Sequence, residues 1–219
     1  GQTINTFYGD ALEFKESYNL LRVLSKDIGQ RLSGSEGAKK AVQWTKKVME
    51  DYGFDSVYLQ PVMVPHWERD KSRQEAYFFN SDNKKITLAI LAAGGSVSTP
   101  KMGLSAGVVE VKSLEEVDRL GEEGVKGKIV FYNKAFNPRF INQGNSYGST
   151  GFQRRSGAIK AAEYGAVASV FRSLSSSDDD VPHTGSMSYK DAVDSIPHAG
   201  LGVVSAKKLS AELKANKEL

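Results

Sequence analysis

Apolar residues in the first quarter of the chain recur at three- and four-residue steps, the spacing of one face of a helix. The first such stripe consists of Phe14, Tyr18, Leu21, Leu24 and Ile28. It predicts a helix over 11–28 with Asp10 as its N-cap. A second stripe over 38–52 predicts another helix, which should end at Gly53 because glycine readily adopts the left-handed conformation of a helix end.

A charged connector over 68–75 marks a change in the pattern and a candidate domain boundary. Short apolar and β-branched runs predict strands over 57–64, 75–79, 86–92, 106–111, 128–133, 168–172 and 200–204. Helices are expected over 114–121, 156–164 and 206–219, and a long loop rich in Asn, Gly and Ser over 137–151. The mixture indicates an α+β chain.

Composition and charge exclude several classes of protein. The formal net charge is only +3, so no nucleic acid partner is predicted, because such a partner needs a concentrated basic face. No apolar run approaches the roughly 20 residues that span a bilayer, so no membrane span is predicted. The chain has no cysteine, which excludes disulfides, cysteine zinc sites and thiol nucleophiles.

Nucleotide and serine-hydrolase motifs are absent or weak. Gly29 and Gly34 have the outer spacing of a phosphate loop, but Ser35 stands where its lysine is needed. Gly144-Asn-Ser146-Tyr-Gly148 matches the nucleophile elbow in letters alone, because no strand is predicted directly before it and no helix directly after it. We therefore predict no catalytic residue here.

The histidines give no metal-binding motif. His66, His183 and His198 each follow a proline, and none belongs to an H-E-x-x-H or H-x-D arrangement. Such histidines are more typical of loops and packing than of metal ligands. The acidic run at 178–180 is typical of a solvated loop. No metal ligand is predicted within the chain.

The start of the helix at 156–164 is the best candidate for binding chemistry. Arg154 and Arg155 precede Ser156, which can cap this helix. Helix starts attract anions through unpaired N–H groups, and guanidinium groups bind carboxylates by paired, charge-assisted hydrogen bonds. The alternative is that one or both arginines are ordinary exposed surface charges.

Five segments occur in the order found in a known family. They are Arg31-Leu-Ser-Gly-Ser-Glu-Gly37, Pro61-Val-Met-Val-Pro-His-Trp-Glu-Arg69, Lys126-Gly-Lys-Ile-Val130, Pro182-His-Thr-Gly185 and Ile196-Pro197. With them the chain resembles the carboxypeptidase Q or plasma glutamate carboxypeptidase-like zinc peptidases, from about Tyr18 to Leu209. The resemblance implies an α/β peptidase domain with an inserted, β-rich protease-associated (PA) domain.

The resemblance also implies a domain plan and a function. Residues 1–70 would begin the peptidase domain, 71–205 would form the PA domain, and 206–219 would return toward the catalytic domain. Members are secreted or periplasmic exopeptidases that cleave short peptides with two zinc ions and a glutamate base. In the family, the zinc-binding His-x-Asp segment and the glutamates follow the PA domain. We therefore expect zinc in the full-length enzyme but none in this chain, which should be inactive alone.

The resemblance further implies a substrate-binding role for Arg154. Folate-hydrolysing carboxypeptidases related to this family place a substrate-carboxylate arginine at the matching position, with Arg155 as the alternative here. The segments over 137–151 and 182–185, including His183, would line the same cleft. A non-catalytic interaction or sorting module is the alternative function. A homo-oligomer that covers the apolar N-terminal helices is a further expectation.

Overall fold

The computed structural model describes residues 2–70, 74–191 and 193–216 and divides the chain into two compact units. Unit 1 is Gly1–Glu68 and unit 2 is Arg69–Leu219. The division falls at the start of the charged connector. Helices and a mixed sheet occur together, which confirms the predicted α+β class.

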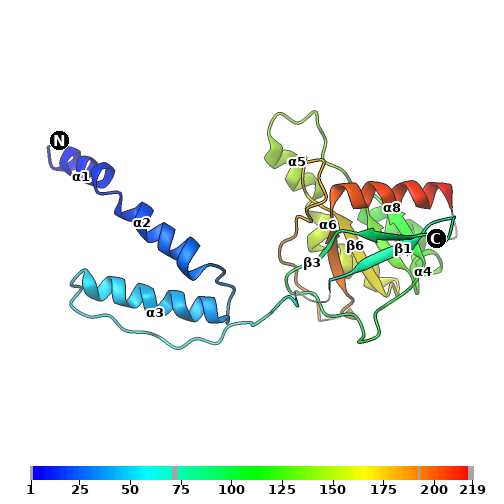
Figure 1. The fold of residues 1–219 in the computed structure, drawn as a ribbon. Coiled ribbons are helices and arrows are strands. Elements are labelled where there is room, and N and C mark those ends of the chain that lie inside the picture. The colour runs from blue at the N-terminus through cyan, green and yellow to red at the C-terminus, as the bar shows by residue number, and fades with distance from the viewer. Residues whose placement is uncertain (1, 71–73, 192, 217–219) are drawn as a thin grey trace. The chain divides into compact units, whose positions relative to one another are not determined.

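Unit 1 is helical (Figure 1). Its elements are α1 (Gln2–Glu13), α2 (Glu16–Arg22), the π-helical turn η1 (Val23–Ile28) and α3 (Glu36–Asp51). The predicted N-cap at Asp10 is wrong, because Asp10 lies inside α1. The break between the first two helices falls instead at Lys15, whose φ of 43° is left-handed. The second predicted helix is confirmed as α3, with the Ser35 hydroxyl accepting from the Ala38 N–H at its start and Gly53 left-handed after its end.

Unit 1 has no buried interior of its own. Among its described residues 3–68, no side chain is buried. Large apolar side chains such as Phe7, Leu12 and Tyr18 are about two-thirds exposed or more. The strand predicted over 57–64 is wrong, because the structure places no strand among these residues and leaves Met63 99% exposed. The apolar pattern there has no neighbouring strand with which to pair.

Unit 2 is built on a five-stranded sheet in the order β3-β7-β6-β5-β4. The strands are β3 (Ile90–Ala92), β4 (Val108–Val111), β5 (Ile129–Tyr132), β6 (Ala168–Arg172) and β7 (His198–Leu201). Strands β4 to β7 are parallel, and β3 pairs with β7 antiparallel at the edge. A two-stranded antiparallel sheet, β1 (Ala76–Phe79) with β2 (Lys85–Leu88), accompanies it.

Besides the strand predicted over 57–64, the strands predicted over 86–92 and 200–204 differ from those observed. The run over 86–92 splits at Ala89, whose N–H donates to the Ser205 hydroxyl rather than to a strand. The last strand ends at Leu201 and not at residue 204. A Cβ at Gly202 would lie 2.1 Å from the Asp180 carboxylate, so the chain passes this point only as glycine. Helix α8 (Val203–Ala215) begins directly afterwards.

Helices cover both faces of the sheet. On one face, α4 (Leu114–Val125) and α7 (Gly157–Glu163) pack on Val130 and Tyr132 of β5. On the other face, Phe131 packs against α8, drawn in red in Figure 1, and against β2. Because strand side chains alternate between faces, one short strand supplies both cores.

A helical segment leads into α7. The loop predicted over 137–151 is partly wrong, because α5 (Gln143–Thr150) forms there with Asn142 as its side-chain cap. Helix α6 (Phe152–Arg155) follows at once. The predicted cap at Ser156 is also wrong. Its hydroxyl makes no cap hydrogen bond, and α7 continues almost directly from α6 instead of emerging from a loop.

Candidate substrate-carboxylate site

Arg154 lies on α6 with its side chain half-buried. Its Nη1 donates a hydrogen bond of 2.7 Å to the Tyr147 hydroxyl on α5, and its guanidinium carbon lies 5.6 Å from the centre of the Tyr147 ring. The Nε group is buried without a protein acceptor. An arginine placed in this way has hydrogen-bonding capacity left for a ligand.

The Tyr147 ring beside this guanidinium belongs to a small aromatic cluster. The Tyr147 ring lies edge-on to Phe136 at 6.3 Å and edge-on to His183 at 5.9 Å between centroids. His183 is exposed, and its backbone N–H donates a hydrogen bond of 2.7 Å to the Ser173 hydroxyl. The structure thus brings the predicted Arg154 and His183 together through Tyr147, which joins them.

Gly185 allows the guanidinium to lie close to the backbone. A Cβ at this position would fall 2.6 Å from Nη1 of Arg154. Any side chain here would therefore displace the guanidinium. This contact gives a physical reason for glycine at the end of the Pro182-His-Thr-Gly185 segment.

His198 supports the backbone of Arg154 from the sheet. It is 1% exposed, and its Nε2 lies 3.1 Å from the Arg154 carbonyl oxygen. Burial lowers the pKa of His198 to about 4, so the ring is neutral at pH 7. The neutral ring donates from Nε2 to this carbonyl, while Nδ1 accepts from the Ser169 hydroxyl at 2.6 Å. Of the two alternatives to a metal ligand, a loop or a packing histidine, His198 is the packing one.

Arg155 occupies different surroundings. Its side chain is exposed, and its guanidinium lies against Gly151, 3.0 Å from where a Cβ would be. Within the part of the chain that the structure describes, no hydrogen bond or ring contact links Arg155 to Tyr147 or His183. Of the two candidate arginines, Arg154 is the one that the fold positions.

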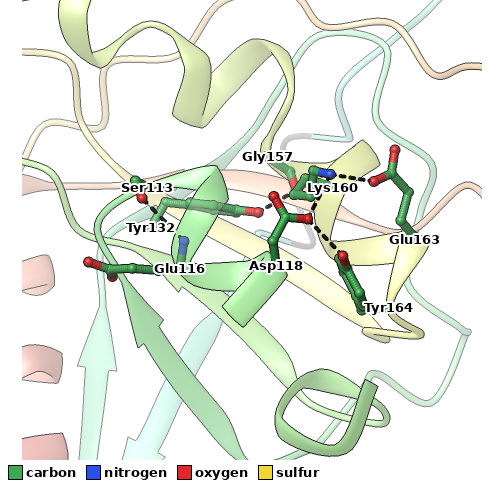
Figure 2. Close-up of polar contacts among 8 residues, drawn as sticks. All are labelled: Ser113, Glu116, Asp118, Tyr132, Gly157, Lys160, Glu163 and Tyr164. Carbon is green, nitrogen blue, oxygen red and sulfur yellow. Dashed lines mark hydrogen bonds and ion pairs between the residues drawn. The ribbon is translucent and has the colours of Figure 1, made fainter. Parts of the chain in front are cut away.

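A second polar cluster joins α4 to α7 (Figure 2). Asp118 accepts hydrogen bonds from the Tyr164 hydroxyl at 2.7 Å and from Lys160 Nζ at 3.1 Å. Lys160 also pairs with Glu163 at 2.7 Å. The hydrogen bond from Tyr164 lowers the pKa of Asp118, and the hydrogen bond to Glu163 raises the pKa of Lys160. Both groups therefore stay charged near pH 7, which suits a structural clamp and not proton transfer.

The described residues contain neither a metal-binding cluster nor a membrane-spanning helix. No three of their His, Asp or Glu side chains come together as metal ligands would. None of their helices combines the length and the apolar character needed to cross a bilayer.

Comparison with known proteins relates the whole chain to one group of peptidases. No family model matches the chain. Carboxypeptidase Q of Xenopus laevis is 42% identical over 194 residues, which are 89% of this chain and 39% of that protein. Human carboxypeptidase Q is 39% identical over 203 residues, 93% of this chain and 40% of that protein. The chain is homologous to carboxypeptidase Q. This confirms the resemblance, and the chain spans about two-fifths of the length of these relatives.

Solved structures agree with the homology to carboxypeptidase Q. A peptidase M28 precursor from Shewanella amazonensis matches 99% of this chain and 48% of its own, with a TM-score of 0.85 and 33% identity. A zinc aminopeptidase from Bacillus subtilis matches with a TM-score of 0.58 at 20% identity, which supports the fold alone.

The carboxypeptidase Q resemblance pointed to Arg154, His183 and the segment over 137–151, but it did not single out Tyr147 within that segment. Tyr147 lies in the segment interpreted as a loop, so nothing in the sequence indicated that a helix would turn its hydroxyl toward Arg154. The sequence also gave no indication that His198 donates a hydrogen bond to the Arg154 carbonyl, because that contact depends on pairing between β6 and β7.

Proposed function

We propose that this chain is the amino-terminal and PA-domain portion of a zinc-dependent exopeptidase that acts on short peptides. Unit 1 would begin the peptidase domain. Within unit 2, residues 71–205 would be the PA domain, which encloses the substrate and binds its carboxylate through Arg154, and 206–219 would lead back toward the catalytic domain. The homology to carboxypeptidase Q and to an M28 peptidase supports the peptidase class.

The observation that carries the carboxylate role is the way in which Arg154 is held. Its backbone carbonyl accepts from a neutral His198, and its guanidinium donates to the Tyr147 hydroxyl. Among the described residues, no carboxylate pairs with this half-buried cation, and its Nε has no acceptor. A substrate carboxylate would supply the missing charge and a planar, two-oxygen acceptor.

His183 and Arg155 have different standing in this proposal. His183 contacts Tyr147 and would line the binding site at its exposed side. Arg155 is close in sequence but faces Gly151, and it would act only as a longer-range positive charge. The proposal also makes the full-length protein secreted or periplasmic, as the resemblance implies.

Zinc does not fit the described residues of this chain. They contain no cluster of three metal-ligating side chains, and the histidines His183 and His198 are engaged with Tyr147 and with the Arg154 backbone. We propose that the zinc ligands and the general base belong to further polypeptide of the full-length enzyme. The contribution of this chain is then to bind and orient the substrate.

The test is made in the full-length peptidase with paired substrates. Arg154→Ala should reduce kcat/KM for peptides with a free carboxylate. The reduction should correspond to a loss of ~1.5–3 kcal/mol in transition-state stabilisation, the range for hydrogen bonds to charged groups. Amidated analogues should lose much less. Arg155→Ala is the matched control, because it removes the neighbouring guanidinium and should have a small effect on both substrates.

Equal losses for the free and amidated peptides would contradict carboxylate recognition by Arg154. Tyr147→Phe provides an intermediate variant, because it removes the hydroxyl acceptor of Nη1 but keeps the ring. Its loss should be smaller than that of Arg154→Ala and should have the same preference for free carboxylates.

A further inference from the structure

A basic pocket lies between α8 and the carboxyl ends of two parallel strands. Its volume is about 450 Å³, and it is lined by Asn133, Arg172, Lys207, Ser210, Ala211 and Lys214. Asn133 directly follows β5 and Arg172 ends β6, while the other four residues form one stripe of α8. In open sheets with parallel strands, ligands commonly bind at the carboxyl edge, where this pocket is found. It is separate from the Arg154 site in its residues.

Arg172 is the residue that makes the pocket unusual. Its side chain is half-buried, and its Nε is a buried donor without a protein acceptor. Within the described residues, its guanidinium makes a single hydrogen bond, a long one of 3.4 Å from Nη1 to the Asn133 side-chain oxygen. Burial lowers the pKa of Arg172, and the charge of Asp178 opposes this effect only in part. A partly desolvated cation of this kind is stabilised by an anion beside it.

The carboxylates nearby are engaged with other partners. Asp178 pairs with Lys207 at 2.6 Å. Glu110 accepts from the Asn133 amide at 2.7 Å and from the Ser210 hydroxyl at 3.0 Å. In the described parts of the chain, neither Arg172 nor Lys214 forms an ion pair. Three cations (Arg172, Lys207 and Lys214) face two carboxylates (Asp178 and Glu110), so the pocket keeps a net positive charge of one beside the unpaired Arg172.

We propose that this pocket binds a small oxyanion of the phosphate class, either inorganic phosphate or a phosphate monoester. Arg172 and Lys214 supply the positive charge, from a strand end and from a helix respectively. Charge-assisted hydrogen bonds from guanidinium and ammonium groups are the usual means by which proteins hold such anions. The volume of about 450 Å³ leaves room for a small organic group next to the phosphate.

The experiment is a titration of the isotopically labelled 219-residue chain with inorganic phosphate at constant ionic strength, followed by NMR. The chain carries Phe7→Ser and Leu12→Ser to limit association through the exposed apolar side chains of α1. Amide signals of the pocket residues should shift and saturate in the millimolar range, and acetate should bind more weakly. Lys214→Ala and Arg172→Gln should each weaken phosphate binding roughly tenfold, the usual loss for one charge-assisted hydrogen bond.

Lys208→Ala is the matched control, because it removes one exposed lysine of the same helix outside the pocket. It should leave the affinity for phosphate unchanged. The proposal is overturned if the shifts do not saturate, if they spread over the surface, or if Lys208→Ala weakens binding as much as Lys214→Ala does. Should Arg172→Gln unfold the chain, the comparison of the two lysine variants decides alone.

Discussion

At the scale of single residues, His198 makes the stability of unit 2 depend on pH. Its pKa is about 4 in the folded chain against an ordinary value of 6.5. Between these two values the imidazole is protonated in the unfolded chain and neutral in the folded chain. This contribution is fully present above the ordinary value and is lost as the pH falls toward 4. We expect the free energy of unfolding to drop by about 2 kcal/mol between about pH 7.5 and about pH 5, measured by denaturant titration.

The histidine variants isolate this effect. His198→Gln removes the titrating ring and should flatten the pH dependence over this range, whatever its effect on stability at neutral pH. His183→Ala removes an exposed ring and should keep the dependence of the parent chain. A parent chain whose stability does not change over this range would show that His198 titrates normally.

At the scale of elements, the Asp118–Lys160 pair fixes α4 against α7. Asp118→Asn should lower the melting temperature, because it removes the charge that Lys160 and Tyr164 both contact. The pKa of Asp118 is lowered by folding, so its contribution is present above the ordinary value of 3.8 and is lost as the pH falls through the folded value. The difference between the two proteins should therefore shrink in strong acid.

Glu122→Gln is the control at this scale. It breaks an ion pair with Lys126 that lies within α4 and its C-cap, so no second element is released. Melting temperature measured by circular dichroism should change less than with Asp118→Asn. An equal decrease in both variants would mean that the clamp between helices adds nothing beyond an exposed pair.

The elements also show how far sequence reasoning reaches. Apolar runs predicted β5 and β6 because these central strands are largely buried on both faces, where composition alone indicates a strand. Strand β4 was predicted by its valines, although it lies at the sheet edge and is only partly buried. Helix α5 was missed because polar contacts from outside the helix help to hold it: the Ser146 hydroxyl accepts from the Asn137 N–H, and the Tyr147 hydroxyl accepts from Arg154. Since Tyr147 belongs to α5, its place in the Arg154 site could not be predicted from the sequence either.

At the scale of the whole molecule, the two units differ in how they use apolar residues. Unit 2 buries Phe131, Tyr132 and Phe171 completely. Unit 1 buries none of its described side chains and leaves Phe7 70% and Leu12 78% exposed. Apolar area on this scale favours association with other polypeptide. In the proposed peptidase, the remainder of the catalytic domain would cover it.

For the 219-residue chain alone, we therefore expect self-association through unit 1. Sedimentation should show oligomers that grow with protein concentration, accompanied by binding of a hydrophobic dye. Replacing Phe7 and Leu12 by serine should reduce both, because it removes apolar area from α1. The control is the double variant Met102→Ser with Ile141→Ser, which removes two side chains of unit 2 that are 97% and 103% exposed. It should change neither the oligomer formation nor the dye binding. A monomeric chain that binds no dye would mean that unit 1 packs its own apolar faces, and the case for a missing covering domain would then lose its physical basis.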